Sequence, residues 1–385
     1  MKKPLIASVL TFATLLAACG GATPAATSTP GTTGSAAAVA DPCGVPVKGK
    51  CPTEAQAVTG AGATFPGPLY TKWIDQYNLL TGVQINYQAV GSGGGIKNFT
   101  DKTVDFGASD VPLTDAQIDA ITGGLYLIPM ALGSVVPTYN IPNVTATVKF
   151  TPEALAGIYL EQIKKWNDPK ITAENPGVTL PDLAITTVHR SDGSGTTGVF
   201  TDYLSKISPE WRTKAGAGTT VSWPGGVGGS GNAGVAGAVK NTPGAIGYVE
   251  LIYAIQNKLG YGVVKNAAGK YVEASLDSTT KAADGFQPPD FGNLKGQAAK
   301  ISITNATGPD AWPISTFTFL LLPKDFSDKA KGLAILRFAW YGTHEGQAFA
   351  KDLGYAPLPT AVQKAAEDVL RSVTGSGTKL LTVNP

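Results

Sequence analysis

The stretch Arg190 to Gly198 reads RSDGSGTTG, and it separates a strand-like apolar run, 184–189, from a helical pattern that begins at Val199. A strand, a tight turn and a helix in this order form the repeating unit of an α/β fold. The small residues of the turn let a ligand approach its backbone. The first N–H groups of the helix have no intrahelical partner and lie at its positive dipole end. The stretch therefore predicts an α/β protein with an anion site at the end of a strand.

Side chains of the same turn supply donors for an oxyanion. Ser194, Thr196 and Thr197 carry hydroxyl groups. Arg190 adds a planar fork of N–H donors that matches an oxyanion, and the carboxylate of Asp192 is placed to hold that fork. The turn therefore predicts an oxyanion site.

Gly193, Gly195 and Gly198 also satisfy the pattern G-x-G-x-x-G of dinucleotide-binding folds. That fingerprint needs residues between its glycines that stay clear of a pyrophosphate, and an acidic residue about 20 positions further on. Here hydroxyl donors lie between the glycines, and two further matches, from Gly226 and Gly229, do not follow a strand. We do not interpret the pattern as a dinucleotide site.

Strand-like runs alternate with helical patterns along the 385 residues, which are enough for two domains with sizeable cores. This order predicts mostly parallel sheets flanked by helices. We expect strands at 83–89, 104–108, 125–137, 184–189, 245–250 and 314–322. We expect helices at 66–80, 114–121, 152–159, 232–240, 328–340, 345–353 and 360–373. The glycine-rich 215–234 and the polar 265–300 predict long surface loops.

The N-terminus has the form of a bacterial lipoprotein signal. Two lysines precede an apolar run, 5–18, that is too short to span a bilayer and leads into Cys19. A secretory signal with a chance cysteine is the alternative. We expect a lipoprotein signal peptide over 1–18, lipidation of Cys19, for example by palmitate, and a lipid-anchored flexible tether over 19–52. The protein would then be extracytoplasmic and held at the cell membrane or envelope, on the periplasmic side or at the cell surface.

The remaining cysteines, Cys43 and Cys51, predict a local disulfide in that oxidising setting. A redox role is not expected, because their spacing is not C-x-x-C. The two histidines, His189 and His344, lie far apart in sequence and no Cys or His cluster accompanies them. We therefore expect no metal site and no cofactor.

Charge argues against nucleic-acid binding. The formal net charge of +2 comes from the two lysines of the signal, and the rest of the chain has 28 basic and 28 acidic residues. A neutral protein does not attract nucleic acid or small anions through its net field. Any affinity for an anion must therefore come from local donors.

Three further segments place small or hydroxyl residues where a predicted strand meets a helix. Thr64 lies in GAGATFP, Ser92 lies in GSGGG and Asp110 ends FGASD. Each segment taken alone fits a helix cap or a turn. Together with RSDGSGTTG they lie at the same ends of successive strands, where open α/β sheets bind their ligands.

Asp110 is unusual in an anion site, because a carboxylate repels an anion. Its functional interpretation is the acceptor of a proton that the ligand still carries, and a helix cap is the alternative. Phosphate keeps at least one proton at neutral pH, whereas sulfate keeps none. A site that demands such a hydrogen bond rejects the wrong ligand by ~10⁴-fold or more. Asp110 therefore favours phosphate over sulfate.

Across 58–358 the sequence resembles the phosphate-binding proteins of bacterial ATP-binding-cassette (ABC) phosphate transporters. The resemblance implies a two-lobed periplasmic-binding-protein (type II) fold, α/β in class, with each lobe a mostly parallel sheet flanked by helices, that closes on one phosphate ion. The motifs that carry it are TGAGATFP (59–66), GSGGG (91–95), VDFGASD (104–110), IYLEQIKKWND (158–168), RSDGSGTTGVF (190–200), PGAIGYVE (243–250) and DAWPI (310–314).

The resemblance also implies the ligand contacts and a residue that steadies the arginine, Asp192. Relatives often carry Ser where this chain has Gly93, so one hydroxyl contact is in doubt, and often carry Arg where it has His189. The positions that match phosphate contacts are Thr64, Phe65 (through its backbone), Ser92, Asp110, Arg190, Ser194, Gly195 and Thr196.

Together these features predict a monomeric receptor that captures inorganic phosphate between two lobes and delivers it to an ABC-type permease. We expect lobe 1 at 53–137 plus 312–385 and lobe 2 at 138–311. A receptor for another oxyanion, such as sulfate, molybdate or arsenate, is the first alternative. An enzyme such as a phosphatase or serine hydrolase is the second, and the sequence has neither a G-x-S-x-G elbow nor a metal cluster to favour it.

Overall fold

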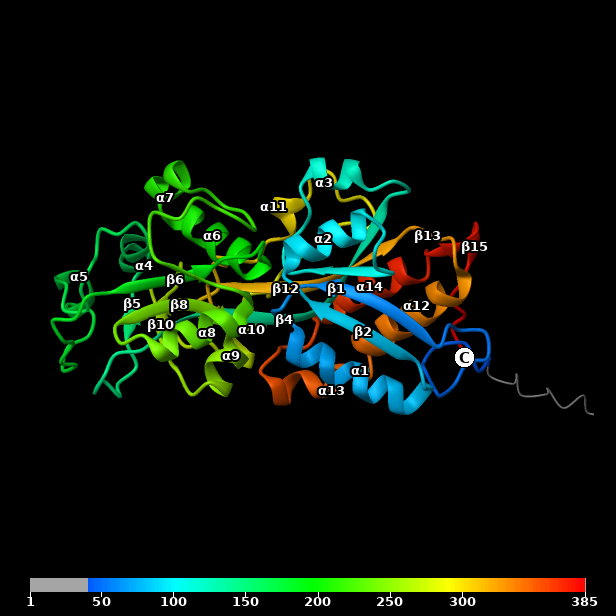
Figure 1. The fold of residues 1–385 in the computed structure, drawn as a ribbon, viewed down its shortest axis with the longest axis horizontal. Helices are drawn as coiled ribbons and strands as arrows, with labels where there is room; N and C mark the ends of the chain where they lie inside the picture. Colours follow the sequence, from blue (N-terminus) through cyan, green and yellow to red (C-terminus); the bar gives the residue numbers. More distant parts are fainter. Residues whose placement is uncertain (1–40, 385) are drawn as a thin grey trace, which may run out of the picture. The chain divides into compact units, whose positions relative to one another are not determined.

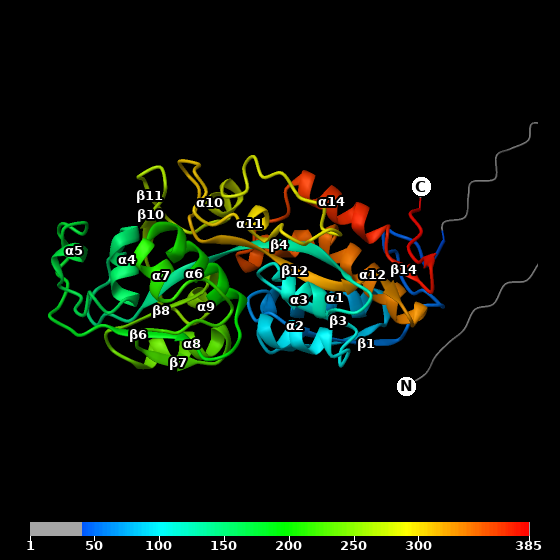
Figure 2. The ribbon, with the colours of Figure 1, turned by 90° about the horizontal axis from the view of Figure 1, so that it is seen from above.

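The structure is a computed structural model that describes residues 41–384, so the predicted signal peptide and Cys19 lie outside the described residues. Its central element is a nine-stranded sheet in the order β2-β1-β3-β12-β4-β8-β6-β7, with β9 beside β4 (Figures 1 and 2). The strands are β1 (Ala57–Gly62), β2 (Gln84–Ala89), β3 (Phe106–Ser109), β4 (Leu125–Tyr139), β6 (Thr186–Arg190), β7 (Val227–Gly229), β8 (Ala245–Glu250), β9 (Gly260–Tyr261) and β12 (Ser315–Pro323).

The sheet contains two groups of parallel strands. In the first group β1 pairs with β2 and β3, and in the second group β6 pairs with β7 and β8. Strand β4 is common to both groups, because it pairs along Leu125–Ser134 with β12 and along Val135–Tyr139 with β8. The predicted α/β class is confirmed.

Helices pack on both groups of strands (Figure 1). Helix α2 contacts β1 and β3, and helix α8 contacts β6 and β8. The helices are α1 (Gly67–Thr81), α2 (Ser92–Thr100), α3 (Asp115–Ala120), α4 (Pro152–Tyr159), α5 (Pro169–Thr172), α6 (Gly195–Ile207), α7 (Pro209–Lys214), α8 (Gly231–Asn241), α9 (Leu251–Gln256), α10 (Leu276–Lys281), α11 (Ala298–Ile301), α12 (Lys329–Thr343), α13 (Gln347–Ala350), the 3₁₀ turn η1 (Lys351–Leu353) and α14 (Thr360–Leu370). Two small sheets consist of β5 (Lys149–Phe150), β10 (Val263–Lys265) and β11 (Tyr271–Val272), and of β13 (Asp325–Phe326), β14 (Thr374–Gly375) and β15 (Thr378–Lys379).

Two segments that the sequence predicted as loops are more ordered than expected. The stretch 265–300 contains β11 and α10, and Phe291 within it is fully buried. The hydroxyls of Thr279 and Ser134 lie 2.7 Å apart and tie this stretch to β4. The sequence of 265–300 predicted a loop because hydroxyl contacts of this kind produce no apolar periodicity. Similarly, 215–234 contains β7 and the start of α8.

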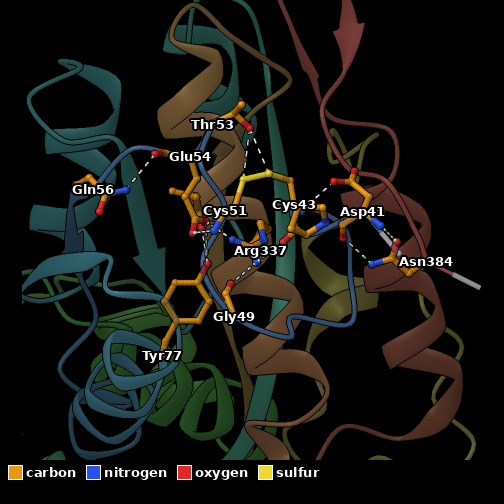
Figure 3. Close-up of a disulfide and its surroundings, with 12 residues drawn as sticks. Asp41, Cys43, Gly49, Cys51, Thr53, Glu54, Gln56, Tyr77, Arg337 and Asn384 are labelled. Carbon is orange, nitrogen blue, oxygen red and sulfur yellow. Dashed lines mark hydrogen bonds and ion pairs between the residues drawn. A yellow bond between two sulfur atoms is a disulfide. The ribbon is translucent and has the colours of Figure 1, made fainter. Parts of the chain in front are cut away.

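Cys43 and Cys51 are joined by a disulfide, and we call the segment from Asp41 to Cys51 that contains this closed loop the N-terminal clasp (Figure 3). The clasp packs against the other end of the chain, because the N–H of Asp41 donates to Oδ1 of Asn384 at 2.9 Å. Residues 41–52, which were expected to form the last part of the tether over 19–52, are instead part of the fold, and residues 19–40 lie outside the described residues.

The clasp also contributes to the surroundings of a buried cation. Arg337 on α12 is fully buried and pairs with Glu54, which is also buried, at 2.5 Å. The Nη2 atom of Arg337 donates to the carbonyl oxygens of Pro42, at 3.2 Å, and Gly49, at 2.7 Å. Figure 3 shows Arg337 between the disulfide and Gly49. The clasp thus supplies two acceptors to a charge that has no access to water.

Candidate functional site

The predicted site residues lie at the carboxyl ends of strands from both groups. In the first group, β1 leads into Thr64 and Phe65, β2 leads into Ser92, and β3 leads into Asp110. In the second group, β6 ends at Arg190 and leads into the remaining predicted residues at the start of α6. Parallel strands present their carboxyl ends at one edge, which is where α/β sheets bind their ligands.

Arg190 is held by Asp192 in a two-point contact. Nε of Arg190 donates to Oδ1 of Asp192 at 2.7 Å, and Nη2 contacts Oδ2. Nη1 points the other way, toward the hydroxyl of Thr196 at 3.4 Å. Burial would raise the pKa of Asp192, but the hydrogen bonds and charge of Arg190, with the N–H of Gly231, outweigh it and hold that pKa below its usual value. Asp192 therefore holds the guanidinium of Arg190 through two of its nitrogen atoms.

Asp110 is buried at the end of β3. Its Oδ1 accepts from the hydroxyl of Thr318 at 2.8 Å, and its Oδ2 accepts from Ser92 at 3.4 Å. Burial raises the pKa of Asp110 to about 7, against the opposing effects of the Thr318 hydrogen bond, the charge of Arg190 and the Ser92 hydrogen bond. The carboxyl group can therefore hold or release a proton near neutral pH.

Several of the predicted contact residues also have open main-chain N–H groups. In the described part of the chain, five of these eight residues have an N–H that donates to no protein acceptor, and helix starts and turns leave such groups open to an anion. Ser194 caps α6, because its hydroxyl accepts from the N–H of Thr197 at 3.0 Å and leaves the first two N–H groups of the helix open. The five open N–H groups belong to Thr64, Phe65, Ser92, Gly195 and Thr196.

Gly195 shows how closely the two groups of strands approach here. A Cβ on Gly195 would lie 2.3 Å from Oγ of Ser92 and 2.5 Å from Oδ2 of Asp110. Similarly, a Cβ on Gly91 would lie 2.4 Å from Oδ2 of Asp192. The structure therefore brings the predicted residues of the two groups together across one small site.

Sequence reasoning missed several residues that hold this site. The amide of Asn232 donates to the hydroxyls of Thr64, at 2.9 Å, and Thr196, at 3.1 Å. The hydroxyl of Tyr253 donates to the carbonyl oxygen of Thr64, and that of Tyr355 to the carbonyl oxygen of Phe65, both at 2.6 Å. These contacts join segments that are far apart in the chain, and the sequence offers no local signal for them.

Glu250 is a second buried carboxyl close to the site. It caps α9, because Oε2 accepts from the N–H of Ile252 at 3.0 Å, and Oε2 shares the proton of the Tyr355 hydroxyl, at 3.2 Å, with the closer carbonyl oxygen of Phe65. Burial raises the pKa of Glu250 well above its usual value, and the negative charge of Asp110 raises it further, although both hydrogen bonds oppose this. Burial of Glu250 therefore favours its neutral form.

The site can bind a small dehydrated anion. One guanidinium, neutralised in part by Asp192, faces one ionisable acceptor, Asp110, and the other polar groups are neutral hydroxyl and N–H dipoles. Fixed dipoles and a positioned arginine can replace the hydration shell of an anion. Between residues 41 and 384 no group of His, Cys, Asp or Glu side chains has the arrangement of a metal site. None of the helices described is both long and apolar enough to cross a membrane.

Comparison with known proteins places the chain in a family. The model of the PBP superfamily domain matches residues 25–335. The Phosphate-binding protein PstS of Xylella fastidiosa (strain Temecula1) is 47% identical over 316 residues, covering 82% of this chain and 85% of that protein. The protein of the same name from Pasteurella multocida (strain Pm70) is 44% identical over 311 residues, covering 80% and 88%.

Solved structures agree in fold at lower identity. A phosphate-binding protein from Stenotrophomonas maltophilia has a TM-score of 0.65 and 19% identity, covering 82% of this chain and 94% of that chain. A high-affinity periplasmic phosphate-binding protein, PfluDING, bound with phosphate, has a TM-score of 0.64 and 21% identity, covering 81% and 93%. The two-lobed type II fold implied by the sequence is confirmed. The chain belongs to the PBP superfamily and, within it, to the family of PstS phosphate-binding proteins.

Proposed function

We propose that this chain is an extracytoplasmic receptor that binds one inorganic phosphate ion between its two lobes and delivers it to an ABC-type permease. Its family consists of binding proteins, so it is not an enzyme. The observation that carries the proposal is Asp110, a buried acceptor with a pKa near 7 among groups that otherwise donate. Such an acceptor stabilises an anion that still carries a proton.

The proposed contacts are those expected from the sequence. The hydroxyl of Ser194, the guanidinium of Arg190 and the five open N–H groups, that of Ser92 among them, donate to the ion, whereas the hydroxyl of Ser92 donates to Asp110. Asp110 accepts the proton of the ion, and Asp192 positions Arg190. The remaining hydroxyl contacts come from Thr64 and Thr196.

We keep the expected lobes, 53–137 plus 312–385 and 138–311, as part of the proposal. The two crossing segments support it, because they run side by side. The N–H of Val135 donates to the carbonyl oxygen of Ile314 at 2.8 Å, and Nε1 of Trp312 donates to the carbonyl oxygen of Val135 at 3.0 Å. A paired crossing of this kind suits a hinge at which the lobes close.

The phosphate assignment is tested by calorimetric titration of the phosphate-stripped protein with phosphate and then with sulfate at neutral pH. We expect one phosphate per chain and no response to sulfate or molybdate. Binding of sulfate and phosphate alike would favour a general oxyanion receptor. Arsenate shares the protonation of phosphate and is expected to compete with it. Light scattering during gel filtration tests the expected monomer.

The anchor is a separate part of the proposal, and it rests on the sequence up to Cys19 alone. We expect the chain to be made with a signal peptide over 1–18 and to be lipidated on Cys19. Labelling cells with a fatty-acid analogue should mark the wild-type protein and not Cys19→Ala. The Cys19→Ala protein should also be released from the membrane fraction. Equal labelling of both proteins would contradict lipidation of Cys19.

A further inference from the structure

Asn232 is the fully buried side chain that joins the hydroxyls of Thr64 and Thr196. It lies in the first turn of α8, whereas Thr64 follows β1 and Thr196 begins α6. The two threonines therefore belong to different groups of strands and meet through one amide. Neither phosphate chemistry nor helix capping requires an asparagine at this place.

The orientation of this amide is fixed by its other end. The oxygen Oδ1 of Asn232 accepts from the N–H of Glu250, at the end of β8, at 2.9 Å. A main-chain N–H can only donate, so the atom that it meets must be the oxygen of the amide. The NH₂ group must therefore face the threonines, and its two protons match their two hydroxyl oxygens.

Each hydroxyl oxygen receives a second donor. Thr64 accepts from the main-chain N–H of Asn232 at 3.3 Å in addition to Nδ2. Thr196 accepts from Nη1 of Arg190 at 3.4 Å in addition to Nδ2. A hydroxyl group has two acceptor positions and one proton. Both acceptor positions of each threonine are therefore filled.

A hydroxyl in this state can only donate. In the described part of the chain, no protein group accepts the proton of Thr64 or Thr196. The two protons are therefore left for a ligand that offers acceptors. A hydroxyl with no protein partner could form a hydrogen bond with either a donor or an acceptor on the ligand. A hydroxyl whose acceptor positions are both filled can bind only an acceptor on the ligand.

We infer that Asn232 is a positioning residue that turns the hydroxyls of Thr64 and Thr196 into obligate donors, and so sets the preference of the site for oxygens without protons at these two points. This inference rests on the proposed phosphate binding. The single proton of the phosphate ion is then directed to Asp110, which is the buried acceptor of the site. Asn232 thus acts on the ligand through two other residues and makes no contact of its own.

The test is a pair of matched substitutions followed by a double-mutant cycle, with inorganic phosphate as the ligand and the whole chain as the protein. Asn232→Leu keeps the branched shape and the neutral charge but removes both donors. Asn175→Leu is the control, because Asn175 is also buried and its amide also holds main-chain groups, those of Lys149 and Ile171, but none of its hydrogen bonds reaches the site. We expect Asn232→Leu to weaken phosphate binding about 10- to 100-fold. Asn175→Leu should leave the affinity within about 2-fold of wild type, even where it lowers stability.

The cycle uses Thr64→Val, which keeps the shape of threonine without its hydroxyl. If Asn232 acts through the hydroxyls, Asn232→Leu reduces phosphate affinity by a smaller factor in the Thr64→Val protein than in the wild-type protein. An equal factor in both backgrounds would overturn the inference, as would unchanged affinity in Asn232→Leu. Should Asn232→Leu fail to fold, Asn232→Asp still accepts from the N–H of Glu250, lacks the two donors, and must bind phosphate more weakly. A wild-type protein that does not bind phosphate would instead reject the proposed function, and this inference with it.

Discussion

The N–H of Gly93, in the first turn of α2, donates to the carbonyl oxygen of Gly193 at 2.9 Å. The two groups of strands therefore meet backbone to backbone beside the site. A Cβ on Gly93 would lie 2.9 Å from Cα of Gly193 and 3.2 Å from its carbonyl oxygen. Gly93 therefore makes a close main-chain contact at the position where the sequence left one hydroxyl contact to the ligand open.

We expect Gly93→Ala to weaken phosphate binding by about 10-fold or more, since overpacking a close contact costs about 1–3 kcal/mol. In the proposed function the lobes separate when no phosphate is bound, so the clash is absent from the ligand-free protein and its thermal unfolding should change little. Gly237→Ala on α8 is the control, because a Cβ there meets no atom within 4 Å. Titration calorimetry measures the phosphate affinity of both variants. An unaltered affinity in Gly93→Ala would show that the contact between Gly93 and Gly193 does not matter for binding.

Much of the fold could be predicted from the sequence where the signals are local. The first helix was expected at 66–80 and is found at Gly67–Thr81, because Pro66 starts it and Gly82, with a φ of 82°, ends it. Strand β4 was expected at 125–137 and continues to Tyr139, since its last residues pair with β8. Periodicity shows which face of an element is buried, but not which distant partner covers it.

The candidate site shows the same division. The turn residues around Arg190 could be named because the chemistry lies within nine residues of sequence, whereas Asn232 contacts Thr64 over a separation of 168 residues. Tyr355 reaches Phe65 over 290 residues. Such partners follow from the tertiary fold and leave no pattern in the sequence. That the named residues contact phosphate stays a prediction.

Asp110→Asn should reduce the discrimination between phosphate and sulfate. The asparagine amide can donate where the carboxylate can only accept, so an ion without protons is no longer penalised. We expect sulfate binding to become measurable and phosphate affinity to fall, so that their ratio drops by about 100-fold or more. Competition between the two anions in calorimetry measures this ratio, and complete rejection of sulfate by the variant would contradict the role of Asp110.

Asp110→Asn should also change how the stability of the ligand-free protein depends on pH. The pKa of Asp110 is raised in the folded state, from 3.8 to about 7. The folded protein therefore binds this proton more tightly than the unfolded chain does, and the resulting stability is present below about pH 4 and is lost as pH rises through 7. Asp110→Asn has no group that titrates at this position, so its stability does not fall in this way as pH rises.

We therefore expect the stability of Asp110→Asn relative to wild type to increase by a few kcal/mol between pH 4 and pH 8, at about 1.4 kcal/mol per unit of pKa. Urea unfolding of phosphate-stripped protein across this range gives the difference. The buried Glu250 is present in both proteins, so its own titration largely cancels in the comparison. A constant difference at all pH values would show that the pKa of Asp110 is not raised.

The disulfide of the N-terminal clasp should contribute to stability without affecting the ligand. Cys43 and Cys51 are eight positions apart, and closing a loop of this length stabilises the folded state by about 2–3 kcal/mol in the chain-entropy description. The clasp touches the buried Arg337 and the C-terminal Asn384, and none of its hydrogen bonds reaches a predicted ligand contact. Replacing both cysteines by serine should therefore lower the free energy of unfolding by about that amount.

A reductant provides the matched control, because it should bring the wild-type protein to the stability of the double variant and leave that variant unchanged. Phosphate affinity should be the same for both proteins, since the open N–H groups and Arg190 keep their positions. A fall in affinity on reduction would mean that the clasp is coupled to lobe closure, and it would require a path from Arg337 on α12 to the strands of the first group. An unchanged free energy of unfolding would mean instead that the buried pair of Arg337 and Glu54 holds the clasp in place without the covalent bond.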